Sequence, residues 1–69
     1  MNRRQVIKKV QDEARRQGLD CQTVEMTRHT AIVVAGVKTG IGRHNEVPER
    51  TAQSIWKQFE GVFGERWWR

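Results

Sequence analysis

The sequence is poor in residues that build covalent or metal-bound scaffolds. Cys21 is the only cysteine among 69 residues, which excludes an internal disulfide and a cysteine-based metal site. No apolar run approaches the roughly 20 residues that a membrane-spanning helix needs. The basic start of the chain leads into amphipathic sequence, not into the apolar segment of a signal peptide. Repeats and linkers are also lacking, so we expect a single domain, residues 1–69, that works in the cytoplasm.

Acidic residues are outnumbered by basic ones. Thirteen lysines and arginines against eight aspartates and glutamates give a formal net charge of +5. Such an excess raises the rate of encounter with a polyanion without identifying it. Most of it precedes Gly18, in Arg3, Arg4, Lys8, Lys9, Arg15 and Arg16. These side chains form either a solvated helix face or a phosphate-binding face.

Hydrophobic periodicity predicts a first helix over Arg3–Gln17. Its apolar residues form one stripe: Val6, Ile7, Val10 and Ala14. Asn2 can cap the helix, Gln5 completes a capping box, and Gly18 supplies the left-handed residue that commonly ends a helix.

Three strands are predicted in the middle of the chain. Leu19–Met26 alternates like a half-buried strand, with Val24 and Met26 as its apolar positions. His29–Val37 is a continuous β-branched run that is typical of a central strand, and Lys38–His44 is a poorer third strand. We therefore expect a three-stranded antiparallel sheet.

The loop between the first two strands decides which way His29 faces. If Thr27 and Arg28 form a two-residue turn, Met26 and His29 are cross-strand neighbours. A longer loop moves the imidazole to the other face, because a slip of one residue flips every side chain.

Glycines flank Ile41 in the third strand. Gly40 and Gly42 indicate a bulge or a close approach to the backbone. The segment GVKTGIG has a superficial likeness to a phosphate loop, but no Gly-Lys-Thr follows a four-residue spacer. We therefore exclude a nucleotide site of that kind.

A second helix is predicted from Pro48 onward. Pro48 suits a first helical turn, and the carboxylates of Glu46 and Glu49 lie near the positive end of the helix dipole. The expected buried stripe is Ala52, Ile55, Phe59 and either Val62 or Phe63, with Trp56 at the edge of the core. The order is thus α-β-β-β-α in an α+β fold, with both helices on one sheet face and the other face free. Its core should contain Ile32 or Val33 together with Val10, Ile55 and Phe59.

His29 is the candidate catalytic residue. An imidazole near neutral pH can take a proton from an attacking hydroxyl and return one to a leaving group. If the substrate is RNA, the hydroxyl is the ribose 2′-OH, and Arg28 with Lys38 or Arg43 can neutralise charge on the phosphorus. The alternative is a structural histidine bonded to a backbone carbonyl or to Glu25.

Three further residues are secondary candidates. His44 lies just before the second helix and is either a second proton-transfer group or a turn residue. With two histidines fifteen residues apart and one cysteine, a metal site is not expected, nor is a cofactor. Trp67 and Trp68 are adjacent, so we expect one to pack on the core edge and the other to bind a partner, with base stacking as a second interpretation.

These segments together resemble the HicA-like family of small toxin ribonucleases, over roughly residues 3–60. In that family a Gly-Ser-His or similar segment opens the second strand, a Val-Pro piece follows the third, and a helix of the type Thr-Leu-x-x-Ile-Leu-Lys-Gln closes the fold. Here His29 matches the motif histidine and Glu46–Pro48 roughly matches the Val-Pro piece. The helix is matched by Thr51, Ile55, Lys57 and Gln58. Thr27–Arg28 stand in place of the small lead-in, and the tail from Trp67 lies outside the pattern.

The resemblance implies a fold like that of double-stranded RNA-binding domains. It also implies cleavage of messenger RNA by the strand histidine and neutralisation by a cognate protein antitoxin. The alternative is a non-catalytic protein on the same scaffold that binds another protein. A double-stranded RNA-binding module ranks lower, because Glu46 and Glu49 stand where such modules carry lysines, and Arg50 alone offsets them.

Overall fold

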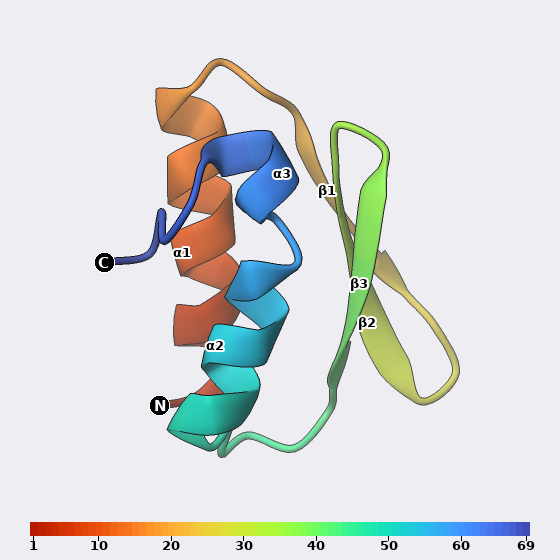
Figure 1. Ribbon diagram of the computed structural model, residues 1–69. Coiled ribbons are helices and arrows are strands. Elements are labelled where there is room, and N and C mark those ends of the chain that lie inside the picture. Colours follow the sequence, from red (N-terminus) through yellow and green to blue (C-terminus); the bar gives the residue numbers. More distant parts are fainter.

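The computed structural model describes residues 1–69 and confirms the predicted order of helix, three strands and helix (Figure 1). An extra short helix follows at the end. The elements are α1 (Arg3–Arg16), β1 (Cys21–Glu25), β2 (His29–Val34), β3 (Val37–Gly42), α2 (Glu49–Lys57) and α3 (Glu60–Phe63). None of the helices is long and apolar enough to cross a membrane.

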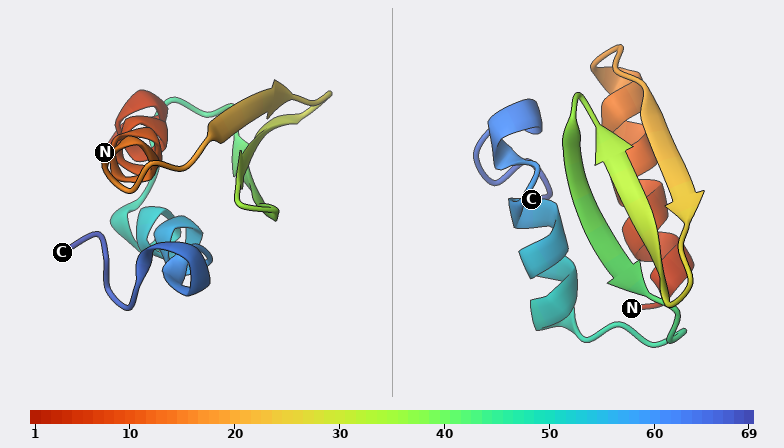
Figure 2. Two further views of the ribbon diagram at one scale, coloured as in Figure 1. Left: turned by 90° about the horizontal axis from the view of Figure 1, so that it is seen from above. Right: turned by 90° about the vertical axis from the view of Figure 1, so that its right-hand side faces the viewer.

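The strands form one antiparallel sheet in the order β1-β2-β3, and the helices cover one of its faces. Figure 2 shows the two layers, with α1 behind β1 and β2 and with α2 on the side of β3. The second sheet face is turned to solvent. The expected fold class, with its free sheet face, is therefore confirmed.

Helix α1 is defined by its own sequence. The Asn2 side chain accepts a hydrogen bond from the Gln5 backbone at 2.8 Å, and the Gln5 side chain accepts one from the Asn2 backbone at 2.9 Å. This is the predicted capping box. At the other end Gly18 adopts a left-handed conformation with φ 72°, and Arg15 and Arg16 lie in the last turn, where cations favour the helix dipole.

The core lies between the helices and the inner face of the sheet. Val10, Ile32 and Phe59 are each 0% exposed, and Ile55 is 5% exposed, as expected. Val33 lies on the other sheet face and is half-buried. Trp56 is 4% exposed and belongs to the core, not to its edge; its indole N–H donates to the Val6 carbonyl at 3.3 Å.

Strand β1 is shorter than predicted and faces the opposite way. It begins at Cys21, because the Leu19 amide donates to the Ala14 carbonyl as part of the helix end. Val24 is 45% and Met26 is 38% exposed, since both lie on the uncovered face. The prediction of these two side chains as the buried positions is wrong. Alternation alone does not say which face the helices will cover.

The boundaries of β2 and β3 differ from the prediction for one reason. Ala35 and Gly36 form a two-residue hairpin turn, with φ values of 51° and 83°. Both central residues of such a turn need positive φ. Alanine rarely adopts it, so β2 was extended to Val37 in the prediction, whereas Val37 begins β3 and β3 ends at Gly42.

The second helical segment is broken. Helix α2 ends at Lys57, and α3 begins at Glu60 after a turn through Gln58 and Phe59. Phe59 remains fully buried at the break, and Phe63 in α3 is 8% exposed. The predicted buried stripe is therefore confirmed, although no single helix carries it.

Candidate functional site

His29 is the first residue of β2 and lies on the uncovered face of the sheet. Its neighbour Thr30 is 1% exposed on the helix side, and successive strand residues face opposite ways. The Met26 amide donates to the His29 carbonyl at 2.8 Å. Of the two alternatives, the structure therefore has the two-residue loop, with Met26 and His29 as cross-strand neighbours. Neither Thr27 nor Arg28 has a positive φ, so this turn is not of the hairpin type that favours glycine.

The imidazole of His29 packs directly over Gly40. A Cβ atom built on Gly40 would lie 2.9 Å from Cδ2 and 3.4 Å from Nε2 of His29. The ring therefore leans diagonally across the sheet onto the β3 backbone, in space that any side chain at position 40 would occupy. Gly42, directly opposite His29, has nothing within 4 Å of such a Cβ. The ladder through both glycines is continuous, so the close approach, and not the bulge, is the confirmed expectation.

Glu25 is engaged on the other face of the sheet. Its Oε1 lies 3.0 Å from the Arg43 guanidinium, and the Thr30 hydroxyl donates to the same oxygen at 3.0 Å. Its Oε2 lies 3.9 Å from Arg3. Glu25 pairs with Thr30 in the ladder, one position away from His29. The interpretation of His29 as a partner of Glu25 is therefore wrong.

Two arginines fix the end of the sheet where His29 lies. Arg43 pairs with Glu25 and also donates to the Met26 carbonyl in the β1–β2 loop. Arg3 donates to the Gly42 carbonyl at 3.2 Å and to the Thr30 hydroxyl. These bonds connect the start of α1, the β1–β2 loop and the end of β3, so three segments are bonded together at the end of the sheet where His29 lies.

The other predicted cations divide between the two ends of the sheet. Arg28 precedes His29, is exposed and takes part in none of the ion pairs. Arg43 follows Gly42, the ladder partner of His29, so Arg28 and Arg43 lie at the same end. Lys38 pairs with Val33 in the ladder, and it precedes Gly42, the partner of His29, by four residues. At the usual rise of a strand, Lys38 and Gly42 are about 13 Å apart. The structure does not bring Lys38 to His29.

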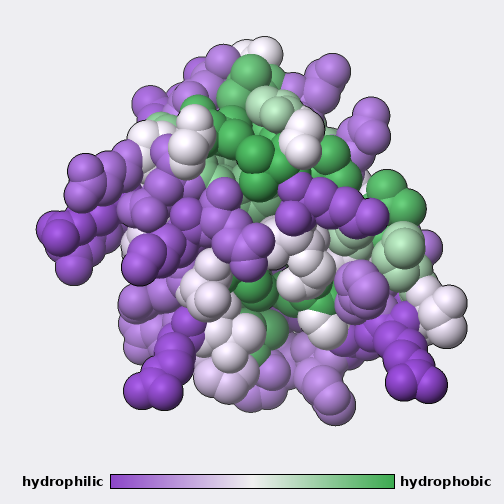
Figure 3. Space-filling view, turned by 45° about the vertical axis from the view of Figure 1, so that its right-hand side comes forward, coloured by the Kyte–Doolittle hydropathy of each residue, from purple (hydrophilic) through white to green (hydrophobic).

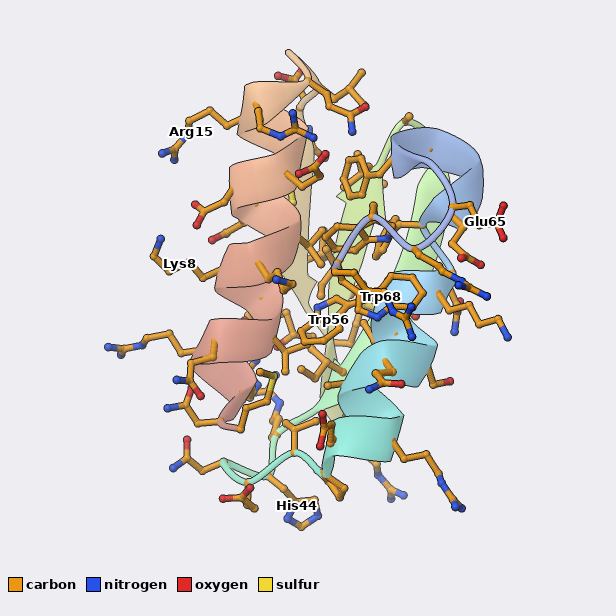
Figure 4. All side chains as sticks on the ribbon, turned by 60° about the vertical axis from the view of Figure 1, so that its left-hand side comes forward. Lys8, Arg15, His44, Trp56, Glu65 and Trp68 are labelled. Atoms are coloured by element: carbon orange, nitrogen blue, oxygen red, sulfur yellow. The ribbon has the colours of Figure 1, made fainter.

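His44 lies two residues beyond Gly42 and is exposed. Figure 4 shows its ring at the lower end of the molecule, directed away from the protein in the loop before α2. It borders a shallow hollow with Ile41, Val47 and Thr51. The two histidines therefore share one end of the fold, but they stand in different surroundings.

The adjacent tryptophans are used differently. The Trp67 indole N–H donates to the Trp56 carbonyl at 2.7 Å, and the Trp67 ring packs edge-on against Phe63 at 4.8 Å. Trp68 contacts the Trp67 ring at 6.0 Å between centroids and lies half-buried at the rim of a hollow beside α2. Trp67 thus has the packing role expected of one member of the pair.

The surface around His29 is mixed. Val24 and Met26 are exposed on the same sheet face, and Figure 3, seen partly from the sheet side, shows apolar patches among hydrophilic side chains. Such a surface offers both polar and apolar contacts to a partner. No group of three or more histidine, cysteine or acidic side chains is placed to hold a metal ion.

Sequence reasoning missed two contributors to the site. The sequence indicates a close approach at Gly40, but nothing in it shows that His29 is the group that approaches. Arg3 belongs by sequence to the basic residues of the first helix, and its bonds to Gly42 and Thr30 depend on contacts 39 and 27 residues away. No local pattern carries that information.

No family model, curated protein or solved structure matches this chain. The resemblance to HicA-like toxins therefore stays a prediction that rests on the residues described above. Function has to be argued from His29 and its surroundings.

Proposed function

We propose that the chain is a small endoribonuclease, a HicA-like messenger RNA interferase, that cleaves RNA with His29. The observation that carries the proposal is the position of this imidazole: it lies on the uncovered sheet face, seated on the Gly40 backbone. A rigid strand holds a reacting group more accurately than a loop does. We further propose that the protein acts in the cytoplasm, where messenger RNA is translated.

The chemistry needs one proton-transfer group. Neutral His29 takes the proton from a ribose 2′-OH, whose oxygen attacks the adjacent phosphorus, and the bond from phosphorus to the 5′-oxygen breaks. The proton on His29, or one from water, passes to the leaving 5′-oxygen. The products are a 2′,3′-cyclic phosphate and a 5′-hydroxyl. A positioned group of this kind contributes about 10²–10⁴-fold to the rate.

Nearby cations support the same reaction. Arg28 is exposed without an ion-pair partner next to His29 and is available to bind the scissile phosphate. Arg43 is half-exposed and shares its charge with Glu25, so we assign it to binding of the strand and to positioning of the loop. Lys38, at the far end of β3, is suited to a phosphate several nucleotides away, not to the one that is cleaved.

The proposed antitoxin is a protein with an acidic surface. The net charge of +5 favours such a partner, and exposed Val24 and Met26 offer it apolar contacts on the face that carries His29. A protein bound there would cover the imidazole and prevent access of RNA. Neutralisation by occlusion needs no conformational change.

The test is induced expression in bacteria of the wild type, His29→Ala and His44→Ala, read by growth and by the integrity of cellular RNA. We expect the wild type and His44→Ala to arrest growth and degrade RNA, and His29→Ala to do neither. His44 is the matched control because it is the only other imidazole and lies at the same end of the fold. With purified protein, an RNA carrying a single 2′-deoxynucleotide at the cleavage position should resist cleavage.

Two results would contradict the proposal. One is cleavage by His29→Ala at the wild-type rate in a folded variant, as judged by thermal unfolding. The other is intact RNA in cells and in the purified assay with the wild type. The second result would favour the alternative, a non-catalytic protein whose exposed Val24 and Met26 bind another protein; then Val24→Ser with Met26→Ser should abolish capture of the partner, whereas His29→Ala should not.

A further inference from the structure

A hollow between α2 and the C-terminal tail combines cations with an aromatic ring, and these residues are separated in the sequence. Three cations, Arg50, Lys57 and Arg66, border it with the indole of Trp68. Figure 4 shows Trp68 lying over α2 on the helical side of the molecule, away from the sheet. The hollow is therefore separate from the His29 face.

The side chains that line the hollow carry more positive than negative charge. Arg50, Lys57 and Arg66 take part in none of the five ion pairs. Glu60 is the one carboxylate in the lining, and it accepts a hydrogen bond from the Arg66 backbone at 3.0 Å. The hollow thus presents three positive side chains and one negative one, and its excess of positive charge fits a polyanion.

The two adjacent tryptophans differ in how they are held, and Trp68 is the one whose indole is accessible to a ligand. Trp67 is fixed by its hydrogen bond to the Trp56 carbonyl and by the rings of Trp56 and Phe63. Trp68 stands at 88° to Trp67 and makes no hydrogen bond of its own. Trp68 therefore contacts Trp67 and also lines the hollow.

We propose that this hollow binds single-stranded RNA, with a base stacked on Trp68 and the flanking phosphates bound by Arg50, Lys57 and Arg66. Sites for single strands combine cations along the backbone with an aromatic side chain that accepts any base. Arg50 and Lys57 lie two helical turns apart on α2, so their side chains follow a strand laid along the helix. An acidic peptide would satisfy the cations but would leave the indole without a stacking partner.

The site goes beyond the proposed function, which assigns RNA to the opposite layer. The largest extent of the molecule is 28 Å, and one RNA strand has to pass round an edge of the fold to contact both the hollow and the sheet face. The hollow would then anchor RNA while another part of the same strand meets His29. The choice of RNA as the polyanion rests on the proposed function, whereas binding itself does not depend on cleavage.

The experiment measures binding of a fluorescent twelve-nucleotide single-stranded RNA to the full chain carrying His29→Ala, which prevents cleavage. The hollow is altered in two ways, by Trp68→Leu and by Arg50→Gln with Lys57→Gln. The matched control is Arg4→Gln with Arg15→Gln, which removes the same charge from exposed, unpaired positions on α1. We expect each hollow variant to weaken binding at least about fivefold and the control pair to weaken it distinctly less.

The indole N–H signals in the nitrogen-resolved NMR spectrum give a second readout. Addition of RNA should shift the Trp68 signal and leave those of Trp56 and Trp67 nearly unchanged. Equal losses in the hollow and control pairs, or no shift of Trp68, would overturn the proposal. So would tight binding of an oligoglutamate peptide that Trp68→Leu does not weaken. Arg50→Gln with Lys57→Gln changes exposed side chains, so this arm stays informative if Trp68→Leu fails to fold.

Failure of this site and failure of the nuclease proposal give different results. If RNA binds in the hollow but the wild type cleaves nothing, the nuclease proposal fails and the site stands. If the wild type cleaves RNA but the hollow variants bind it normally, the site fails and the nuclease proposal stands.

Discussion

One methyl group at position 40 tests whether the seat of His29 matters. In Gly40→Ala the new Cβ would lie 2.9 Å from Cδ2 of the imidazole, whereas non-bonded carbons settle at about 3.5–4.0 Å. The ring must therefore move by roughly 0.6–1.1 Å, or turn into another rotamer. The strand beneath cannot follow, because Ala31 and Ile32 are fully buried.

The size of the effect follows from that displacement. A shift of about 1 Å in a reacting group can cost about 100-fold in rate, so we expect RNA cleavage to fall about 10–100-fold in Gly40→Ala. Stability should not fall with it. The methyl group points to the open face, and alanine is favoured over glycine in a strand by about 0.5–1 kcal/mol. The substitution thus separates placement of the imidazole from integrity of the fold.

The control is Gly42→Ala, on the same strand and the same face. Its Cβ meets nothing within 4 Å, so cleavage should stay within about twofold of the wild type. The assay pairs RNA cleavage with NMR spectra of the His29 ring protons, which report displacement even if no RNA is cleaved. Ring signals that do not change in Gly40→Ala would refute the packing of His29 over Gly40. Changed signals with full cleavage would refute the link between placement and rate.

Two further predictions concern the fold around the site. Trp67→Ala should lower the free energy of unfolding by about 2–4 kcal/mol in thermal or denaturant unfolding, because it removes the hydrogen bond to Trp56 and the contact with Phe63. A loss below about 0.5 kcal/mol would show that the tail does not pack on the core. Glu13 tests the pH dependence of stability. The hydrogen bond from Arg16 holds the pKa of the Glu13 carboxyl below its ordinary value. The ionised form of Glu13 therefore stabilises the fold above the pKa of the unfolded chain, and this contribution is lost as the pH falls through the folded pKa. Glu13→Gln should therefore be less stable than the wild type at neutral pH, and the two should converge in acid; a difference that persists unchanged to about pH 2 would exclude this role.

The first helix could be predicted because its signals are local. Asn2, Gln5 and Gly18 act within one or two helical turns of the ends that they fix. Interactions that a chain makes with its own near neighbours are visible in sequence. The length of the loop at Thr27–Arg28, and with it the face on which His29 lies, could not be decided from the sequence, because neither residue favours one turn type.

The errors arose where a choice is made by distant parts of the chain. Val24 and Met26 alternate as buried residues do, but the helices cover the opposite sheet face, and alternation is the same for both faces. Ala35 adopts a positive φ that its side chain disfavours, so the hairpin turn carries only half of the usual signal, the glycine at position 36.

The sites were predicted less fully than the fold. His29 was identifiable by its type and place at a strand end, yet the glycine that seats it is eleven residues away. From the sequence, base stacking by Trp68 is only a second interpretation, because no basic cluster is visible around it. The cations come from Arg50 and Lys57 on α2, which the turn after Lys57 brings back against the tail.

The arrangement of contacts along the chain also bears on how the protein is made. The sheet is a meander, in which every strand pairs with its neighbour in sequence, so its hydrogen bonds form early and over short loops. The helices meet across the whole chain: the indole of Trp56 reaches the carbonyl of Val6, fifty residues earlier. On a ribosome, the part of the inner sheet face beside β3 and the part of α1 that contacts Trp56 would therefore stay uncovered until α2 has emerged. A nascent chain should therefore complete its core only when α2 has left the ribosome and Trp56 can reach α1.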